Sequence, residues 1–384
     1  MNKKKLLISV LVLLALAALV YLQVRTWRKF DWEKFWNVTR GINVSYLLIG
    51  TGLIYVDYFL RAVRWKIMLR PVRQTSAMGL VAPTMIGFTG LALLGRPGEF
   101  IRPYLIARRT NLSMSSQVAV WTIERIFDTG AFGLIMALNI LISSSTLKKL
   151  PGFRNSPRAF FDFQISGVIL LAGVAVAAYF VYAVRKNPAR MATLSQRLLS
   201  GVSERVAGSI ARRVQAFGEG LNTVQDFKSF LQLSGISLVI WLIIGLSYVA
   251  VTNAYHIHRH AQMTLSNVLL LTAASVVGGV LQLPVVGGGS QLATIGVLHG
   301  IFSLSPELST SCGMMLWLVT FMSVIPAGLF LAHHEHVSLT RLEKESEAIG
   351  ASGQPAIRPT KQTGDSSIAV PKSEEPAKPD RWVN

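Results

Sequence analysis

Six apolar stretches, each long enough to cross a lipid bilayer as a helix, constrain this chain more than any other feature of its sequence. They cover residues 6–24, 44–60, 118–141, 165–184, 231–251 and 314–332. A bilayer core requires about 20 apolar residues in helical form, and its lack of water excludes irregular backbone exposed to lipid. Two further apolar regions, residues 78–107 and 265–302, are interrupted by glycine and proline. The sequence therefore predicts an all-α polytopic membrane protein with six full spans and two broken regions.

The charge content supports this class and argues against others. Only 15% of the residues are charged, whereas soluble domains carry roughly a quarter. The 38 Lys and Arg against 19 Asp and Glu give a net charge of +19, but these basic residues flank apolar segments, so no nucleic-acid partner is predicted. The single cysteine, Cys312, lies in an apolar stretch, so neither a disulfide framework nor a cysteine metal site is expected.

The distribution of basic residues predicts the orientation, because cytoplasmic loops are enriched in Lys and Arg. If the N-terminus is cytoplasmic and each broken region re-enters on one side, 20 Lys and Arg face the cytoplasm and 10 face outward. This bias favours cytoplasmic N- and C-termini. The lysines at residues 3–5 precede an apolar run, as in a signal peptide. That run is long and lacks a convincing cleavage site, so we interpret it as a retained anchor.

Two segments outside the spans differ in composition. Residues 187–228 place Leu198, Val202, Val206 and Ile210 four apart among polar residues. This spacing is typical of an amphipathic helix on the cytoplasmic leaflet, or of a solvated linker helix. Residues 337–384 contain five prolines among Ser, Lys and Glu and are predicted to be a disordered cytoplasmic tail. Residues 1–336 are then the transmembrane domain.

Charged residues gather in and just after the first broken region. The motif GRPGEFIRPYLIARR breaks the backbone at Gly95, Pro97 and Gly98 and carries charges at Arg96, Glu99 and Arg102. The motif WTIERIFD then places Glu124, Arg125 and Asp128 inside an apolar segment. Charges at membrane depth need partners or a water-filled cavity, so these residues are expected to line one polar cleft. The alternative is a salt-bridge network that only clamps the fold.

The second broken region repeats this plan without the charges. The motif LPVVGGGSQ contains Pro284, Gly287, Gly288, Gly289 and Gln291. An offset of 192 residues brings Glu99 onto Gln291 and Asp128 onto Thr320. Because the two regions would start from opposite sides of the membrane, we interpret them as re-entrant hairpins of an inverted repeat, which typically marks a site near the midplane. The glycines do not form a phosphate-binding P-loop, since its lysine is missing.

Other polar patterns in the sequence give little indication of a functional site. Asp57 and Arg61 are four residues apart and are interpreted as an ion pair at the membrane edge. The alternating histidines His256, His258 and His260 have no nearby carboxylate or thiol to complete a metal site. No nucleotide-binding, metal-protease or nucleophile-elbow motif occurs. The sequence thus predicts no metal and no cofactor, and it favours a transporter over an enzyme.

The charged motifs also resemble those of a known family. GRPGEFIRPYLIARR followed by LSMSSQVAVWTIERIFD resembles the signature of the lysylphosphatidylglycerol synthase transmembrane region, or flippase-like domain family. LQLPVVGGGSQ resembles its second glycine-rich element. The resemblance covers about residues 6–332 and implies a helical membrane fold with two re-entrant hairpins, in a family whose members flip aminoacylated phospholipid or accompany glycolipid and hopanoid pathways. Many members have Glu where Gln291 stands, and the aminoacyl-transferase domain of bifunctional members is missing, so lipid aminoacylation is not expected.

These observations predict a lipid flippase of the bacterial inner membrane, whose partner is an anionic or lipid-linked headgroup and which is compatible with a homo-oligomer. The alternatives are an integral-membrane transferase on lipid-linked substrates, with Glu99 or Asp128 as general base, and an accessory subunit of lipid synthesis. The predicted headgroup-binding residues are Arg96, Glu99, Arg102, Glu124, Arg125, Asp128 and Gln291. Gly95, Pro97, Gly98, Pro284, Gly287, Gly288 and Gly289 would form the re-entrant loops.

Overall fold

The computed structural model describes residues 30–201, 204, 207–211, 214, 227–255, 263–280 and 288–335, and all regular structure in these ranges is helical. Several predictions lie outside them: the span at 6–24, the histidine motif, Pro284 and Gly287, the tail at 337–384, and much of 187–228. The part of 187–228 that is described includes the helix α10 (Pro188–Ser200), which follows directly on α9.

Six helical segments are long and apolar enough to cross a membrane. They are α3 (Val44–Leu69), α4 (Ala77–Leu94), α6 (Met114–Ile142), α9 (Pro157–Lys186), α12 (Phe227–Asn253) and the unit Pro306–His334, formed by α15 (Pro306–Trp317), η4 (Leu318–Met322) and α16 (Val324–His334). The prediction of an all-α polytopic membrane protein is confirmed. The sequence had placed α4 in a broken region, but Pro83 does not interrupt this helix, which ends only at Gly95.

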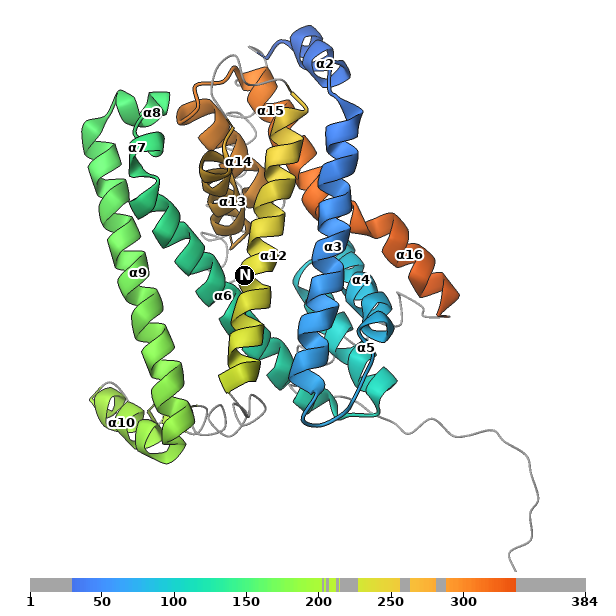
Figure 1. The fold of residues 1–384 in the computed structure, drawn as a ribbon, viewed down its shortest axis with the longest axis vertical. Helices are drawn as coiled ribbons and strands as arrows, with labels where there is room; N and C mark the ends of the chain where they lie inside the picture. The colour runs from blue at the N-terminus through green and yellow to red at the C-terminus, as the bar shows by residue number, and fades with distance from the viewer. Residues whose placement is uncertain are drawn as a thin grey trace, which may run out of the picture.

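Two helical hairpins lie within the bundle (Figure 1). In the first, α4 leads through the turn η1 (Arg96–Phe100) into α5 (Ile101–Thr110), which packs back on α4. In the second, α14 (Gly288–Gly300) packs on α13 (Leu265–Val280). Glycines permit both approaches, since a Cβ on Gly98 would overlap the Gly90 carbonyl and one on Gly278 would overlap that of Gly289. Each broken region thus contains two helices that pack against each other. Their re-entry into a membrane stays a prediction.

Contacts between distant segments define the two ends of the bundle. At one end, the amide of Asn43 donates to the carbonyl of Ala254 at 3.0 Å, which joins the start of α3 to the end of α12. At the other end, Arg109 donates to Glu335 at 2.5 Å, which joins α5 to the residue after α16. The α4–α5 hairpin opens at this second end, and the α13–α14 hairpin opens at the first (Figure 1).

The helices that follow the two hairpins correspond closely. Both α6 and the unit Pro306–His334 have 29 residues and lie 192 positions apart. Each is capped by a serine, Ser113 or Ser305, whose hydroxyl accepts a hydrogen bond from an amide three residues further on. These features support an inverted repeat with the offset that the sequence indicated.

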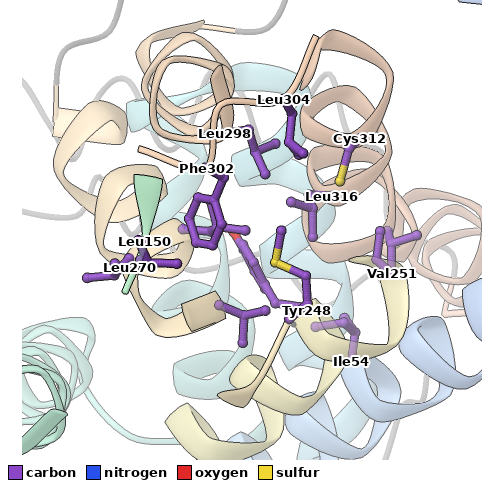
Figure 2. Packing of buried hydrophobic residues seen from close by; sticks show 14 of the residues in the cluster. Ile54, Leu150, Tyr248, Val251, Leu270, Leu298, Phe302, Leu304, Cys312 and Leu316 are labelled. Atoms are coloured by element: carbon purple, nitrogen blue, oxygen red, sulfur yellow. The ribbon is translucent and has the colours of Figure 1, made fainter. Parts of the chain in front are cut away.

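Short elements cover the end of the bundle that includes Asn43. They are α2 (Trp32–Arg40), α7 (Ser144–Leu147) and α8 (Pro151–Arg154). Helix α2 packs on α15, where Lys34 lies 2.9 Å from Glu307. The largest apolar core lies beneath these elements and includes Ile54, Tyr248, Phe302 and the buried Cys312 (Figure 2). This core packs against the second hairpin. The buried charged residues lie in the opposite half of the helical bundle.

Candidate functional site

Helix α3 supplies three charged residues to the buried site. Asp57, Arg61 and Arg64 follow each other at intervals of four and three residues, so they share one face of the helix. All three are buried, and Arg64 is 0% exposed. Burial of single charges at membrane depth is costly, so this face must meet counter-charges on another helix.

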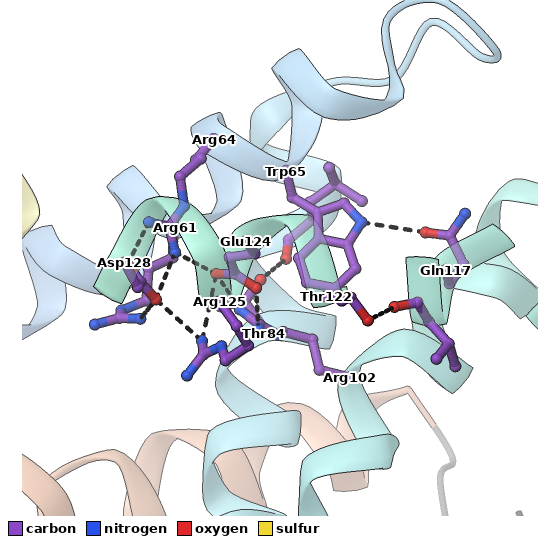
Figure 3. A network of polar contacts seen from close by, with 12 residues as sticks. Arg61, Arg64, Trp65, Thr84, Arg102, Gln117, Thr122, Glu124, Arg125 and Asp128 are labelled. Atoms are coloured by element: carbon purple, nitrogen blue, oxygen red, sulfur yellow. Dashed lines mark hydrogen bonds and ion pairs between the residues drawn. The ribbon is translucent and has the colours of Figure 1, made fainter. Parts of the chain in front are cut away.

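Those counter-charges lie on α6, one turn apart (Figure 3). The Arg64 guanidinium donates to both oxygens of Asp128, at 2.5 and 3.2 Å, and to Oε1 of Glu124. Its Nη1 also donates to the hydroxyl of Ser237 on α12 at 2.9 Å. A single planar guanidinium therefore joins three helices, which an ammonium group could not do with the same geometry.

Arg102 reaches the same Glu124 carboxylate from α5. Its Nη1 donates to Oε1 at 3.1 Å and its Nη2 donates to Oε2, in a two-pronged pair. The guanidinium also lies over the rings of Trp65 and Phe88, at 4.4 and 5.1 Å from their centroids. Trp65 in turn donates to the amide oxygen of Gln117 at 3.1 Å. Both oxygens of Glu124 are thus occupied by arginines, and the first hairpin is tied to α3 and α6.

The prediction that Asp57 and Arg61 form an ion pair is confirmed, and its position at the membrane edge stays a prediction. The ion pair exists, with Arg61 Nε at 2.9 Å from Asp57 Oδ2. However, both residues are buried, and Arg61 Nη1 also lies 3.7 Å from Asp128. The pair therefore belongs to the same group of buried charges as Arg64, Glu124 and Asp128, because this face of α3 points toward α6.

Arg125 is the solvent-accessible member of this group of buried charges. Its side chain is 44% exposed, and its Nη2 lies 3.2 Å from Asp128 and 3.8 Å from Glu124. In the described part of the chain, the ion pairs connect four arginines with three carboxylates. We call these seven residues the charge network: Asp57, Arg61, Arg64, Arg102, Glu124, Arg125 and Asp128.

Not all predicted site residues join the charge network. The backbone of Arg96 lies in η1, and Glu99 on the same turn forms no ion pair with a described residue. Gln291 is 6% exposed on α14, and no hydrogen bond connects it to the network among the described residues. The structure therefore does not bring the predicted residues of both hairpins into one cluster, since α14 packs on α13 and α15.

Two glycines of the predicted loops have backbones that favour glycine. Gly95 has φ of +69° and ends α4, and Gly288 has φ of +58° at the start of α14. L-residues rarely adopt this conformation, so glycine is favoured at the end of α4 and at the start of α14. Pro97 and Gly98 lie in η1, and Gly289 is buried against Gly278.

Sequence reasoning missed Arg64, the member of the charge network that joins α3 to both α6 and α12. It had counted this arginine among the cytoplasmic positive charges. The available signal was the spacing of Asp57, Arg61 and Arg64 on one helical face, next to an apolar span. With regard to metals, the described residues include no group of three His, Cys, Asp or Glu side chains that could hold an ion, and arginines occupy the carboxylates of Glu124 and Asp128.

Together, the helices and the site define a polytopic all-α membrane protein whose spans bury a network of arginines and carboxylates. Residues 6–328 match the family model of the lysylphosphatidylglycerol synthase TM region. The chain therefore belongs to this family, as its motifs predicted, and is an integral membrane protein of lipid metabolism or transport. No curated protein and no solved structure gives a significant match to the chain.

Proposed function

We propose that this protein moves a lipid with an anionic headgroup between the two leaflets, and that the charge network binds the headgroup. One observation carries the proposal: four arginines face three carboxylates, so the network has a formal charge of +1. An uncompensated charge at membrane depth is unfavourable, and an anion would neutralise it. Arg125 is the member whose side chain is exposed, so the anion would bind there.

The chemistry of the residues supports a phosphate as this anion. Guanidinium groups bind phosphate through two parallel charge-assisted hydrogen bonds. Arg102 is buried behind Glu124, so we assign it, together with Arg64, the role of positioning that carboxylate. Glu99 and Gln291 lie on the two hairpins outside the network and would contact the lipid at other stages of its passage.

The two hairpins would provide access from each leaflet in turn, because they open at opposite ends of the bundle. We place the Arg109 end in the cytoplasm and the protein in the bacterial inner membrane, with both termini cytoplasmic; oligomerisation is compatible with this arrangement. Arg61, Arg64 and Arg102 belong to the buried network and should not count as loop charges. Without them the distribution of Lys and Arg is 17 to 10, which still favours this orientation.

An integral-membrane transferase acting on lipid-linked substrates is the alternative. A general base must be free to accept a proton, whereas arginines hold both oxygens of Glu124 and of Asp128. Glu99 forms no ion pair with a described residue, so it would be the base. Incubation with a labelled lipid-linked sugar would distinguish the two functions, because only the transferase releases a product.

The test uses proteoliposomes that contain phosphatidylglycerol with a fluorophore on one acyl chain. Accessibility of the fluorophore to an external quencher reports movement between leaflets. Arg125→Lys keeps the charge but loses the planar fork, so it should fold normally and lose most of the movement. Arg109→Lys is the matched control, because Arg109 is also 44% exposed and pairs with a carboxylate outside the network.

Wild-type movement by Arg125→Lys would contradict the role of this residue in binding the headgroup. No movement of phosphatidylglycerol by the wild type, with product formation from a lipid-linked donor, would instead support the transferase. Arg102→Lys would be a less informative test than Arg125→Lys, because Arg102 is buried and this variant is expected to lose stability as well as activity.

A further inference from the structure

A cavity of about 400 Å³ lies between α6, α9 and α12, away from the charge network. Its walls include Gly130 and Leu134 from α6, Val174 and Ala178 from α9, and Leu238 from α12. This volume falls within the range of roughly 300–1,000 Å³ that is usual for ligand pockets. Because the wall consists almost entirely of apolar side chains, the ligand that fits it is apolar along most of its length.

Small residues create this cavity. Toward α7, Gly133 and Gly167 allow α6 and α9 to touch: a Cβ on Gly133 would lie 2.7 Å from Val174, and one on Gly167 would lie 2.6 Å from Ile140. Toward α10 the two helices separate (Figure 1). There, a Cβ on Gly130 would have no atom within 4 Å. Protein interiors are normally close-packed, so a space of this size that small residues keep open calls for an occupant.

The position of the cavity indicates what that occupant is. All three walls are helices long and apolar enough to cross a membrane, so an apolar ligand that enters from the bilayer would be a lipid hydrocarbon chain. Near the end of α9 that leads into α10, Tyr182 lines the cavity, and Lys186 on α9 and Lys228 at the start of α12 are exposed. Tyrosine and lysine at the end of a span typically lie at the headgroup level. Two cations at this end fit a negatively charged headgroup.

The cavity and the charge network use different faces of α6. Glu124 and Asp128 are four residues apart and point toward α3 and α5, whereas Ile123, Phe127 and Gly130 line the cavity. A lipid whose phosphate contacts Arg125 would therefore not place its chain here. We propose that the cavity binds one acyl chain of an anionic phospholipid that stays with the protein, distinct from the lipid that the charge network handles.

The experiment uses the purified full-length protein in detergent and a phosphatidylglycerol with a photoactivatable diazirine on one acyl chain. Mass spectrometry of the digested protein locates the cross-links, which should fall on residues 123–134, 174–182 and 230–238. Gly130→Phe fills the cavity from α6 and should reduce this labelling at least tenfold. Gly173→Phe is the matched control, since Gly173 is exposed on α9 and also has no atom within 4 Å of its Cβ position.

Labelling by Gly130→Phe at the wild-type level would overturn the proposal. If that variant does not fold, Ala178→Phe fills the same space from α9 and serves the same purpose. Equal labelling by a phosphatidylcholine probe would overturn the assignment of an anionic headgroup, and Lys186→Gln with Lys228→Gln should lower phosphatidylglycerol labelling several-fold. Arg125→Lys should leave the labelling unchanged, which separates this site from the proposed transport site.

Discussion

Gly87 provides a stringent test of the structure because it sets the position of Arg102. It lies in α4 directly opposite α5: a Cβ at position 87 would be 2.4 Å from the Cβ of Arg102 and 2.9 Å from its Cα. Carbon atoms pack at about 3.5–4.0 Å, so Gly87→Ala would have to push α5 away by roughly 1.1–1.6 Å. The hydrogen bond from Arg102 Nη1 to Glu124, now 3.1 Å long, would then exceed the normal range of about 2.7–3.2 Å.

The expected sign is opposite to that of an ordinary glycine-to-alanine change in a helix. Alanine is favoured over glycine by about 1 kcal/mol in helix interiors, whereas overpacking of a close contact costs about 1–3 kcal/mol, and a weakened partner of the buried Glu124 adds to that cost. Gly87→Ala should therefore destabilise the protein. Gly52 on α3 has no atom within 4 Å of its Cβ position, so Gly52→Ala should be neutral or stabilising.

Unfolding of both variants in mixed detergent micelles, followed by tryptophan fluorescence, measures the difference. We expect the midpoint of Gly87→Ala to fall below that of the wild type and that of Gly52→Ala to stay level or rise. Equal midpoints for the two variants would refute the close packing of α5 on α4, and with it the geometry inferred for Arg102.

Three other predictions address the network, the packing and the orientation. Arg64→Met removes two hydrogen bonds to the buried Asp128 carboxylate and should cost about 1.5–3 kcal/mol in the same unfolding assay; a loss below about 1 kcal/mol would contradict its central position. Gly328→Ala would overlap the hydroxyl of Thr89 and should be destabilising, and adding Thr89→Ala should recover part of the loss; strictly additive effects would argue against this contact. Reporter fusions should be external at Lys148 and cytoplasmic at Arg190, and the reverse result would invert the proposed orientation.

The candidate site was only partly predictable from the sequence. Glu124, Arg125, Asp128 and Arg102 stood out because charges are rare in apolar segments, and the structure brings all four together. The pattern also suggested that Gln291 belongs to the same cluster, and the structure does not place it there. Short-range spacing shows which residues share a helical face, but it does not show which helix that face meets.

The fold class, the family and most of the helices can be established from the amino-acid sequence. Long apolar segments must be helical in lipid because every backbone polar group needs a partner within the segment, and local signals such as the Ser113 cap and Gly95 set where helices begin and end. The tertiary structure alone decided that Arg64 joins α3 to α6, that Arg125 is the accessible arginine, and that small residues such as Gly130 leave a cavity. Those features depend on contacts between residues far apart in the chain, since both the balance of buried charge and the space left between helices arise only when the helices pack.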